Sequence, residues 1–317
     1  MSNRRMTLPA RAMALSVVPA LLFVPVHASA PGASTGMVYK FTMTTSVNAT
    51  PTTGVGQVSG DKSRVDFSEA PKGAGANPFI SAGNYMLATR GGATFTVVDP
   101  EKKQYFKMDM DALAGLVNGL TGIMNVKFNN LQIDVQDLGA GEKIAGFATR
   151  HFRKTTSYDM EMKVLFVKSR SSVADTVDMW FAPELADIVN PFMASSVNNA
   201  GSFSFNDANY AAQEKAAAEK TARAGAVVKM EMTGVATDGK KNARPHSMSM
   251  LITGVSRTDI PASTFEIPSG YTEVASPVPA AQPSAATSDD ESNKAATDSA
   301  KKPDKKKGGI LGKFHIP

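Results

Sequence analysis

The sequence predicts an α+β domain built on one strongly curved antiparallel sheet, with a few helices on its concave side. Three observations lead to this prediction. Short segments with apolar residues at every second position recur along the chain, and this period of two is typical of half-buried strands. The connections between them are short and rich in turn-forming residues, which favours antiparallel pairing. Only three segments show helical signals.

Two groups of predicted strands carry the alternating pattern. In the first group, MVYKFTMT (37–44) and SRVDF (63–67) alternate, and residues 84–108 divide into three strands because RGG and DPEKK are turn sequences. The second group consists of LQIDV (131–135), YDMEMKVLF (158–166), VDMWF (177–181), VVKMEMTGV (227–235) and HSMSMLITGV (246–255). In YDMEMKVLF the apolar residues share one face and the charged residues lie mostly opposite, so this strand is the clearest of all.

Three helices are expected. The first spans residues 109–124, where leucine and isoleucine recur at helical spacing. The second, in residues 182–189, has Pro183 at a favourable first-turn position. The third spans residues 206–225, starting at a capping Asn or Asp and stopping at a glycine. Because its apolar content is mostly alanine, we expect this third helix on the surface or in a long connection.

Both ends of the chain differ in composition from the domain between them. Residues 1–30 combine an arginine-containing start, an apolar segment and small-residue cleavage sites, which predicts a signal peptide cleaved after Ala28 or Ala30. Residues 275–317 are rich in Pro, Ala, Ser and Lys and end in a short apolar stretch, which predicts a disordered tail. The folded domain is therefore expected at residues 31–274 of a periplasmic or secreted bacterial protein.

Composition and charge exclude several classes of function. The chain has no cysteine, so disulfides, thiolate nucleophiles and Cys-ligated metals are ruled out. The net charge of +5 resides in the leader and the tail, and residues 31–274 carry equal numbers of both signs. A domain without a basic excess offers no general attraction for nucleic acid, so we expect no nucleic-acid partner.

Part of the chain resembles known bacterial envelope proteins. The succession of GQVSGDKSRVDF (56–67), a loop containing proline and then residues 83–108 resembles the early sheet of the periplasmic lipoprotein carrier family of LolA. The run beginning GEKIAGFATRHFRK (141–154) resembles the uncharacterised envelope family called domain of unknown function 4412. The resemblance covers residues 36–270 and implies an incomplete β-barrel whose helices close an apolar concave face. No functional residue of those carriers is transferred to a position of this chain.

Motifs for catalysis are absent from the sequence. It contains no HExxH, phosphate-binding loop, GxSxG or dinucleotide fingerprint, so we expect a non-enzymatic protein without a cofactor. His246 shares strand parity with Met248 and Met250, which leaves a copper site as a weak alternative. The strongest local positive cluster is RHFRK (150–154), which we interpret as a solvated strand edge or a contact for an acidic partner or lipid headgroups.

Met-x-Met pairs occur four times, each with a polar residue between the methionines. Three interpretations remain open: plain strand core, an adaptable face for apolar ligands, or a Cu(I) site of thioethers. The candidate residues for an apolar ligand face are Tyr39, Phe41, Met43, Phe106, Met108, Tyr158, Met160, Met162, Phe166, Met230, Met232, Met248 and Met250.

The function expected from these observations is binding or carriage of a hydrophobic ligand, such as a lipid or an acyl chain, on the concave face. The alternative is an envelope scaffold with a closed core that docks on a membrane surface or envelope protein through its lysine-rich tail. A Cu(I)-binding protein that uses the methionine pairs is the third possibility.

Overall fold

The computed structural model describes residues 36–73, 79–89, 92–123, 126–164, 167–186, 207–239 and 242–276. The predicted signal peptide, the tail from residue 277 onward and Phe166 lie outside the described residues.

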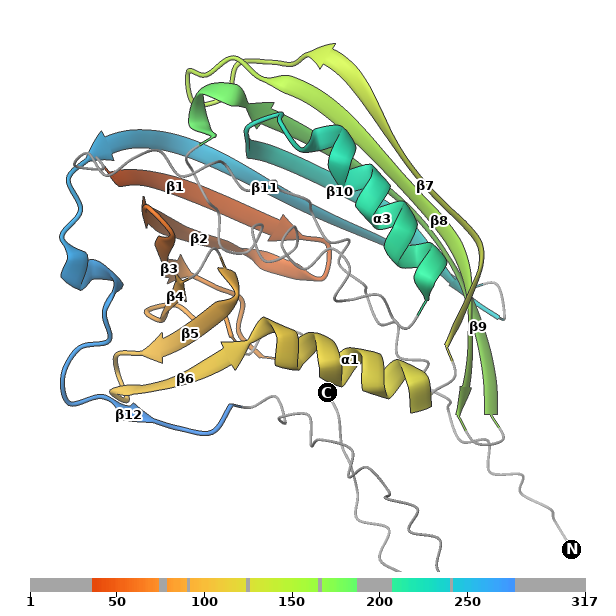
Figure 1. Ribbon diagram of the computed structural model, residues 1–317, viewed down its shortest axis with the longest axis horizontal. Coiled ribbons are helices and arrows are strands. Elements are labelled where there is room, and N and C mark those ends of the chain that lie inside the picture. The colour runs from red at the N-terminus through yellow and green to blue at the C-terminus, as the bar shows by residue number, and fades with distance from the viewer. Residues whose placement is uncertain are drawn as a thin grey trace, which may run out of the picture. The chain divides into compact units, whose positions relative to one another are not determined.

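Twelve strands form one sheet, in the spatial order β12-β6-β5-β4-β3-β2-β1-β11-β10-β9-β8-β7. Neighbouring strands are antiparallel except for β12 and β6, which run parallel. Figure 1 shows the sheet curving around α3, and β7 and β12 form its two ends, so the sheet is not closed. The predicted single antiparallel sheet with few helices is confirmed at this level.

The strands follow the alternating segments of the sequence. Their bounds are β1 (Gly36–Thr45), β2 (Asn48–Ser59), β3 (Lys62–Glu69), β4 (Tyr85–Thr89), β5 (Thr94–Asp99), β6 (Gln104–Asp109), β7 (Lys127–Ala140), β8 (Arg150–Val164), β9 (Val167–Ala182), β10 (Ala226–Asp238), β11 (Ala243–Thr258) and β12 (Thr272–Glu273). Strands β7 to β11 are longer than predicted, because flanking residues outside the alternating apolar segments also pair with the neighbouring strands.

The helices match the predictions only in part. Helix α1 (Met110–Ile123) forms as expected, and the Asp109 carboxylate accepts hydrogen bonds from the first backbone N–H groups. The second predicted helix is a single 3-10 turn, η2 (Pro183–Leu185), and its remainder lies outside the described residues. Helix α3 (Ala208–Thr221) begins at the predicted cap Asp207 but ends four residues before Gly225.

Seven of the fourteen residues of α3 are exposed and the helix lies in the connection between β9 and β10, in agreement with the expectation of a surface or connecting helix, but one side of it is buried. Its residues Tyr210, Glu214, Ala217 and Thr221 are buried, and it packs beside β7 on the concave face of the sheet (Figure 1). We call the concave face of the sheet the inner face. The location depends on the few residues that point at the sheet, and the alanine-rich composition did not indicate it.

Two apolar clusters share the inner face. The helix-covered cluster joins residues of β7 to β11, among them Val177, with Ala217 of α3. The N-terminal cluster surrounds Phe67 on β3 and its neighbours on β4 and β5. Met43 packs against the N-terminal cluster and pairs directly with Met250 of the helix-covered cluster. The two clusters therefore form one apolar layer along the sheet.

The opposite face of β4 to β6 is covered by the C-terminal end of the described chain. Ile267 and Tyr271 pack against Tyr85, Leu87 and Val98. Strand β12 then pairs with β6, and this pairing fixes the segment in place.

Candidate functional site

A row of methionines crosses the inner face at one level of the sheet. Met43 of β1 pairs with Met250 of β11, Met250 with Met230 of β10, and Met230 with Met179 of β9. Met179 pairs in turn with Phe152 of β8. We call these five residues the methionine row. Side chains that face each other across antiparallel strands have Cβ atoms about 4.5–5.5 Å apart, so the row is continuous.

A second level of the same face extends this thioether surface. Met232 pairs with Met248, and both pack in or against the helix-covered cluster. The row spans four strand spacings, which corresponds to about 19 Å and to the length scale of a long alkyl chain. Methionine is flexible and polarisable, so this layer can adapt its shape to an apolar guest.

The structure places the predicted ligand-face residues at different depths. Five are buried: Tyr39, Tyr158, Met230, Met232 and Met250. Seven are half-buried: Phe41, Met43, Phe106, Met108, Met160, Met162 and Met248. They divide between clusters: Phe106 and Met108 pack against the N-terminal cluster, and Met160 packs near Tyr158 at the far end of β8. Two of the four Met-x-Met pairs, Met230/Met232 and Met248/Met250, lie directly opposite each other, whereas the other two pairs lie elsewhere on the sheet.

One expected neighbour of the methionines belongs elsewhere. Strand parity predicts that Val228 joins Met230 and Met232. A register shift between Val227 and Lys229 interrupts the alternation against β9, and Val227 packs in the helix-covered cluster instead. Val228 belongs to a different cluster, around Tyr39.

A buried ion pair fastens α3 to the inner face. Lys154 Nζ donates to both carboxylate oxygens of Glu214, at 2.8 Å and 2.7 Å. The two side chains are only 2% and 3% exposed. This corrects the interpretation of RHFRK as a strand edge, because β8 lies between β7 and β9 and Lys154 points inward. Sequence patterning missed the pair, since a lysine in a basic run is usually solvated.

A second polar contact lies on the same face and depends on a glycine. Asp175 Oδ1 lies 2.8 Å from His246 Nε2, although their strands are separated by β10. Gly234 occupies the intervening position, where a Cβ atom would lie 1.9 Å from the Asp175 oxygen. Burial raises the pKa of the Asp175 carboxyl, and the charges of His246 and Lys154 oppose this rise.

Two tyrosines complete the polar layer under α3. Tyr158 and Tyr210 are both buried and both contact the Phe128 ring, with centroid distances of 5.1 Å and 5.3 Å. Burial raises the pKa of both phenols, so they stay protonated at neutral pH. The hydroxyl of Thr156, also buried, has no hydrogen-bond partner among the described residues.

Helix α3 also covers the outermost strand of the sheet. The Gln213 side chain accepts a hydrogen bond from the Ile133 backbone N–H and donates to the Leu131 carbonyl. Lys220 donates to the Val135 carbonyl. The amide of Gln213 therefore takes the place of a peptide group beside β7 and blocks the pairing of another strand there.

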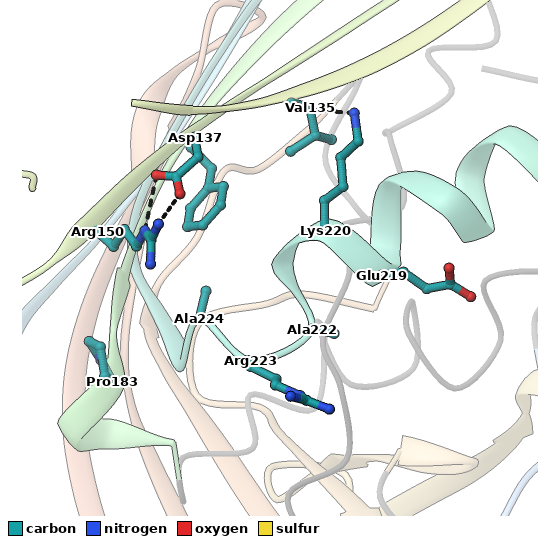
Figure 2. A pocket seen from close by; sticks show the side chains of 10 residues that line it. Val135, Asp137, Arg150, Pro183, Glu219, Lys220, Ala222, Arg223 and Ala224 are labelled. Carbon is teal, nitrogen blue, oxygen red and sulfur yellow. Dashed lines mark hydrogen bonds and ion pairs between the residues drawn. The ribbon is translucent and has the colours of Figure 1, made fainter. Parts of the chain in front are cut away.

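A pocket of about 720 Å³ opens where α3 ends against β7 and β8 (Figure 2). Its apolar lining comes from Val135, Phe152, Pro183, Ala222 and Ala224. Three of these, Val135, Phe152 and Ala224, belong to the helix-covered cluster. Phe152 is also the end of the methionine row, so the row ends at the wall of the pocket, although none of its methionines is among the lining residues.

Charged side chains surround this apolar lining. Arg150 donates to Asp137 on one wall, with Nε 3.0 Å from Oδ1, and this bond lowers the pKa of the Asp137 carboxyl. Lys220 is paired with Asp134 at 2.9 Å. Arg223 also lines the pocket. The pocket is therefore amphipathic, because apolar side chains line part of it and charged side chains line the rest.

Both histidines in the described part of the chain contact carboxylates. His246 is bonded to Asp175, and His151 stacks on Trp180 at 4.3 Å and lies 2.7 Å from Asp178. Within the described part of the chain, no group of three or more His, Cys, Asp or Glu side chains is arranged to hold a metal.

Comparison with models of known protein families and with curated protein sequences gives no match. Among the described residues, no helix has the length and apolar character needed to cross a membrane. The site is therefore interpreted from its own geometry, which is that of an open antiparallel sheet with an apolar, methionine-rich inner face and an amphipathic pocket at its margin.

Proposed function

We propose that this protein binds an apolar chain, such as an alkyl or acyl chain, on the inner face of its sheet. The observation that carries the proposal is the connection between the pocket and the methionine row through Phe152. A chain that enters beside Phe152 reaches a cluster in which four methionines pack beside three valines. The methionine side chains change rotamer at low cost, which suits ligands of varied shape.

Helix α3 is the cover of this binding surface. It contributes alanines to the helix-covered cluster, and its firmest attachment is the pair between Glu214 and Lys154. Because the alanines of α3 bury little apolar area, replacing their contact with an apolar ligand loses little hydrophobic free energy. We infer that the apolar chain takes the place of part of this alanine contact while the end of α3 stays on the sheet, and that the methionines rearrange around it.

The proposal includes a role in the bacterial envelope. The leader-like residues 1–30 and the resemblance to the LolA carrier family both support an exported carrier with an incomplete barrel. In the alternative, the core is closed and the protein is a scaffold. The low exposure of Met230 (2%), Met232 (7%) and Met250 (8%) favours this alternative. Copper binding by the methionine pairs remains the third candidate, and no cofactor or catalytic activity is proposed.

Carriage of an apolar ligand is tested with a variant whose new side chain fills the pocket. Ala222 lines the pocket and is half-buried, so Ala222→Trp places an indole in the opening without entering the core. We expect wild-type protein, purified without detergent, to enhance the fluorescence of the neutral probe N-phenyl-1-naphthylamine. The variant should lose this enhancement.

The matched control is Ala216→Trp, because Ala216 is an exposed residue of the same helix. It should bind the probe as the wild type does. Native mass spectrometry of the wild type should also show a retained lipid-sized adduct. No probe binding by folded wild-type protein, together with no adduct, would establish the closed scaffold instead.

A further inference from the structure

The charges at the pocket are balanced, and this balance bears on the ligand headgroup. Arg150 is neutralised by Asp137 and Lys220 by Asp134. The remaining pocket charges are those of Glu219 and Arg223, one of each sign. A site of this kind does not attract an anion or a cation by its net charge.

Glu219 and Arg223 are the two pocket charges available to a ligand. Both side chains are exposed, and neither has an ion-pair partner within the described part of the chain. The helix ends at Thr221, with Ala222 as its cap, so Arg223 lies beyond the last turn. Figure 2 shows both side chains projecting from the end of α3, away from the bonded pair of Arg150 and Asp137.

We propose that the ligand is an amphiphile with a zwitterionic headgroup, whose anionic group meets Arg223 while its cationic group meets Glu219. This inference rests on the proposed function, because the alkyl tail is assigned to the apolar lining of the pocket and the methionine row. A guanidinium binds a phosphate through two parallel hydrogen bonds, and a carboxylate attracts a nearby ammonium. A singly charged headgroup would leave one of the two residues opposite a like charge or without a partner.

The test uses three probes with the same dodecyl tail and different headgroups. Dodecylphosphocholine, dodecyl phosphate and dodecyltrimethylammonium are titrated into the full mature chain by calorimetry, below their critical micelle concentrations. We expect dodecylphosphocholine to bind about fivefold tighter than either charged probe, the effect of one exposed ion pair of about 1 kcal/mol. Equal affinities for the three probes would overturn the headgroup assignment and leave tail binding intact. If none of the probes binds, the proposed function itself fails.

Charge exchange gives an independent result. Arg223→Glu should move the preference to dodecyltrimethylammonium, and Glu219→Arg should move it to dodecyl phosphate. The double exchange keeps one charge of each sign and should restore the preference for dodecylphosphocholine. Lys215→Glu, an exposed position on the same helix that does not line the pocket, changes the net charge as Arg223→Glu does and should leave the order of affinities unchanged. If Lys215→Glu also moves the preference to dodecyltrimethylammonium, the net charge alone sets the order of affinities and the proposal is overturned.

Discussion

The buried pair of Lys154 and Glu214 decides whether α3 is held on the inner face. Glu214→Leu leaves the Lys154 ammonium, 2% exposed in the folded protein, without its counter-charge. Removing one partner of a buried ion pair costs about 3–5 kcal/mol, a large share of the 5–15 kcal/mol by which a typical domain is stable. Replacing both partners, as in Lys154→Met with Glu214→Leu, removes the buried charges together and should return the unfolding free energy to near the wild-type value or above it.

Urea denaturation followed by the fluorescence of Trp180 measures these free energies, because this buried side chain is the chain's one tryptophan. The matched control is Arg170→Met, since Arg170 is 74% exposed in its pair with Glu161 and should leave the urea midpoint nearly unchanged. A Glu214→Leu variant as stable as the Arg170 variant would refute the reasoning, because α3 would then not be anchored by this pair.

Three further predictions concern the same layer. Gly234→Ala should lower the unfolding free energy by about 1–3 kcal/mol, because the new Cβ displaces Asp175 or His246, whereas Gly254→Ala, which meets open space, should change it far less. Asp175→Asn should gain stability relative to wild type as pH rises above 3.8, measured by urea titration at several pH values. Burial raises the folded-state pKa of the Asp175 carboxyl, so the wild type loses stability as this carboxyl deprotonates with rising pH, whereas the asparagine variant has no carboxyl to deprotonate. A variant that loses stability relative to wild type as the pH rises would contradict this. Gln213→Leu should promote dimers by edge pairing of β7, detectable by light scattering at high concentration, and a strictly monomeric variant would show that the amide does not protect the edge.

Local sequence patterns were sufficient for most of the strands and for α1. Alternation of apolar and polar residues places one face of a strand on a core, and turn residues fix the ends, so the strands of residues 84–108 appear where predicted. Local sequence patterns do not predict where α3 packs. An alanine-rich helix has no apolar stripe that identifies its partner, and its location depends on Glu214 meeting a lysine 60 positions earlier.

The methionine row also lies beyond a single-sequence argument. Each Met-x-Met pair is visible in the sequence, yet the row joins Met43, Met250, Met230 and Met179 through the register of four strands. A shift of one residue in any pairing would turn a strand's methionines to the other face, and turn chemistry alone does not fix pairings so distant in the chain. The glycine at position 234 was the one local signal of the contact between His246 and Asp175.

The most direct test of binding on the methionine row is methyl NMR of protein labelled with ¹³C at the methionine ε-methyl groups. Signals are assigned by single Met→Leu exchanges, and N-phenyl-1-naphthylamine is titrated in. We predict that the methyl signals of Met43, Met179, Met230 and Met250 shift with the aromatic probe, while that of Met37, which packs in a separate cluster, stays in place. Saturable probe binding that leaves the four signals of the row unmoved would contradict the account.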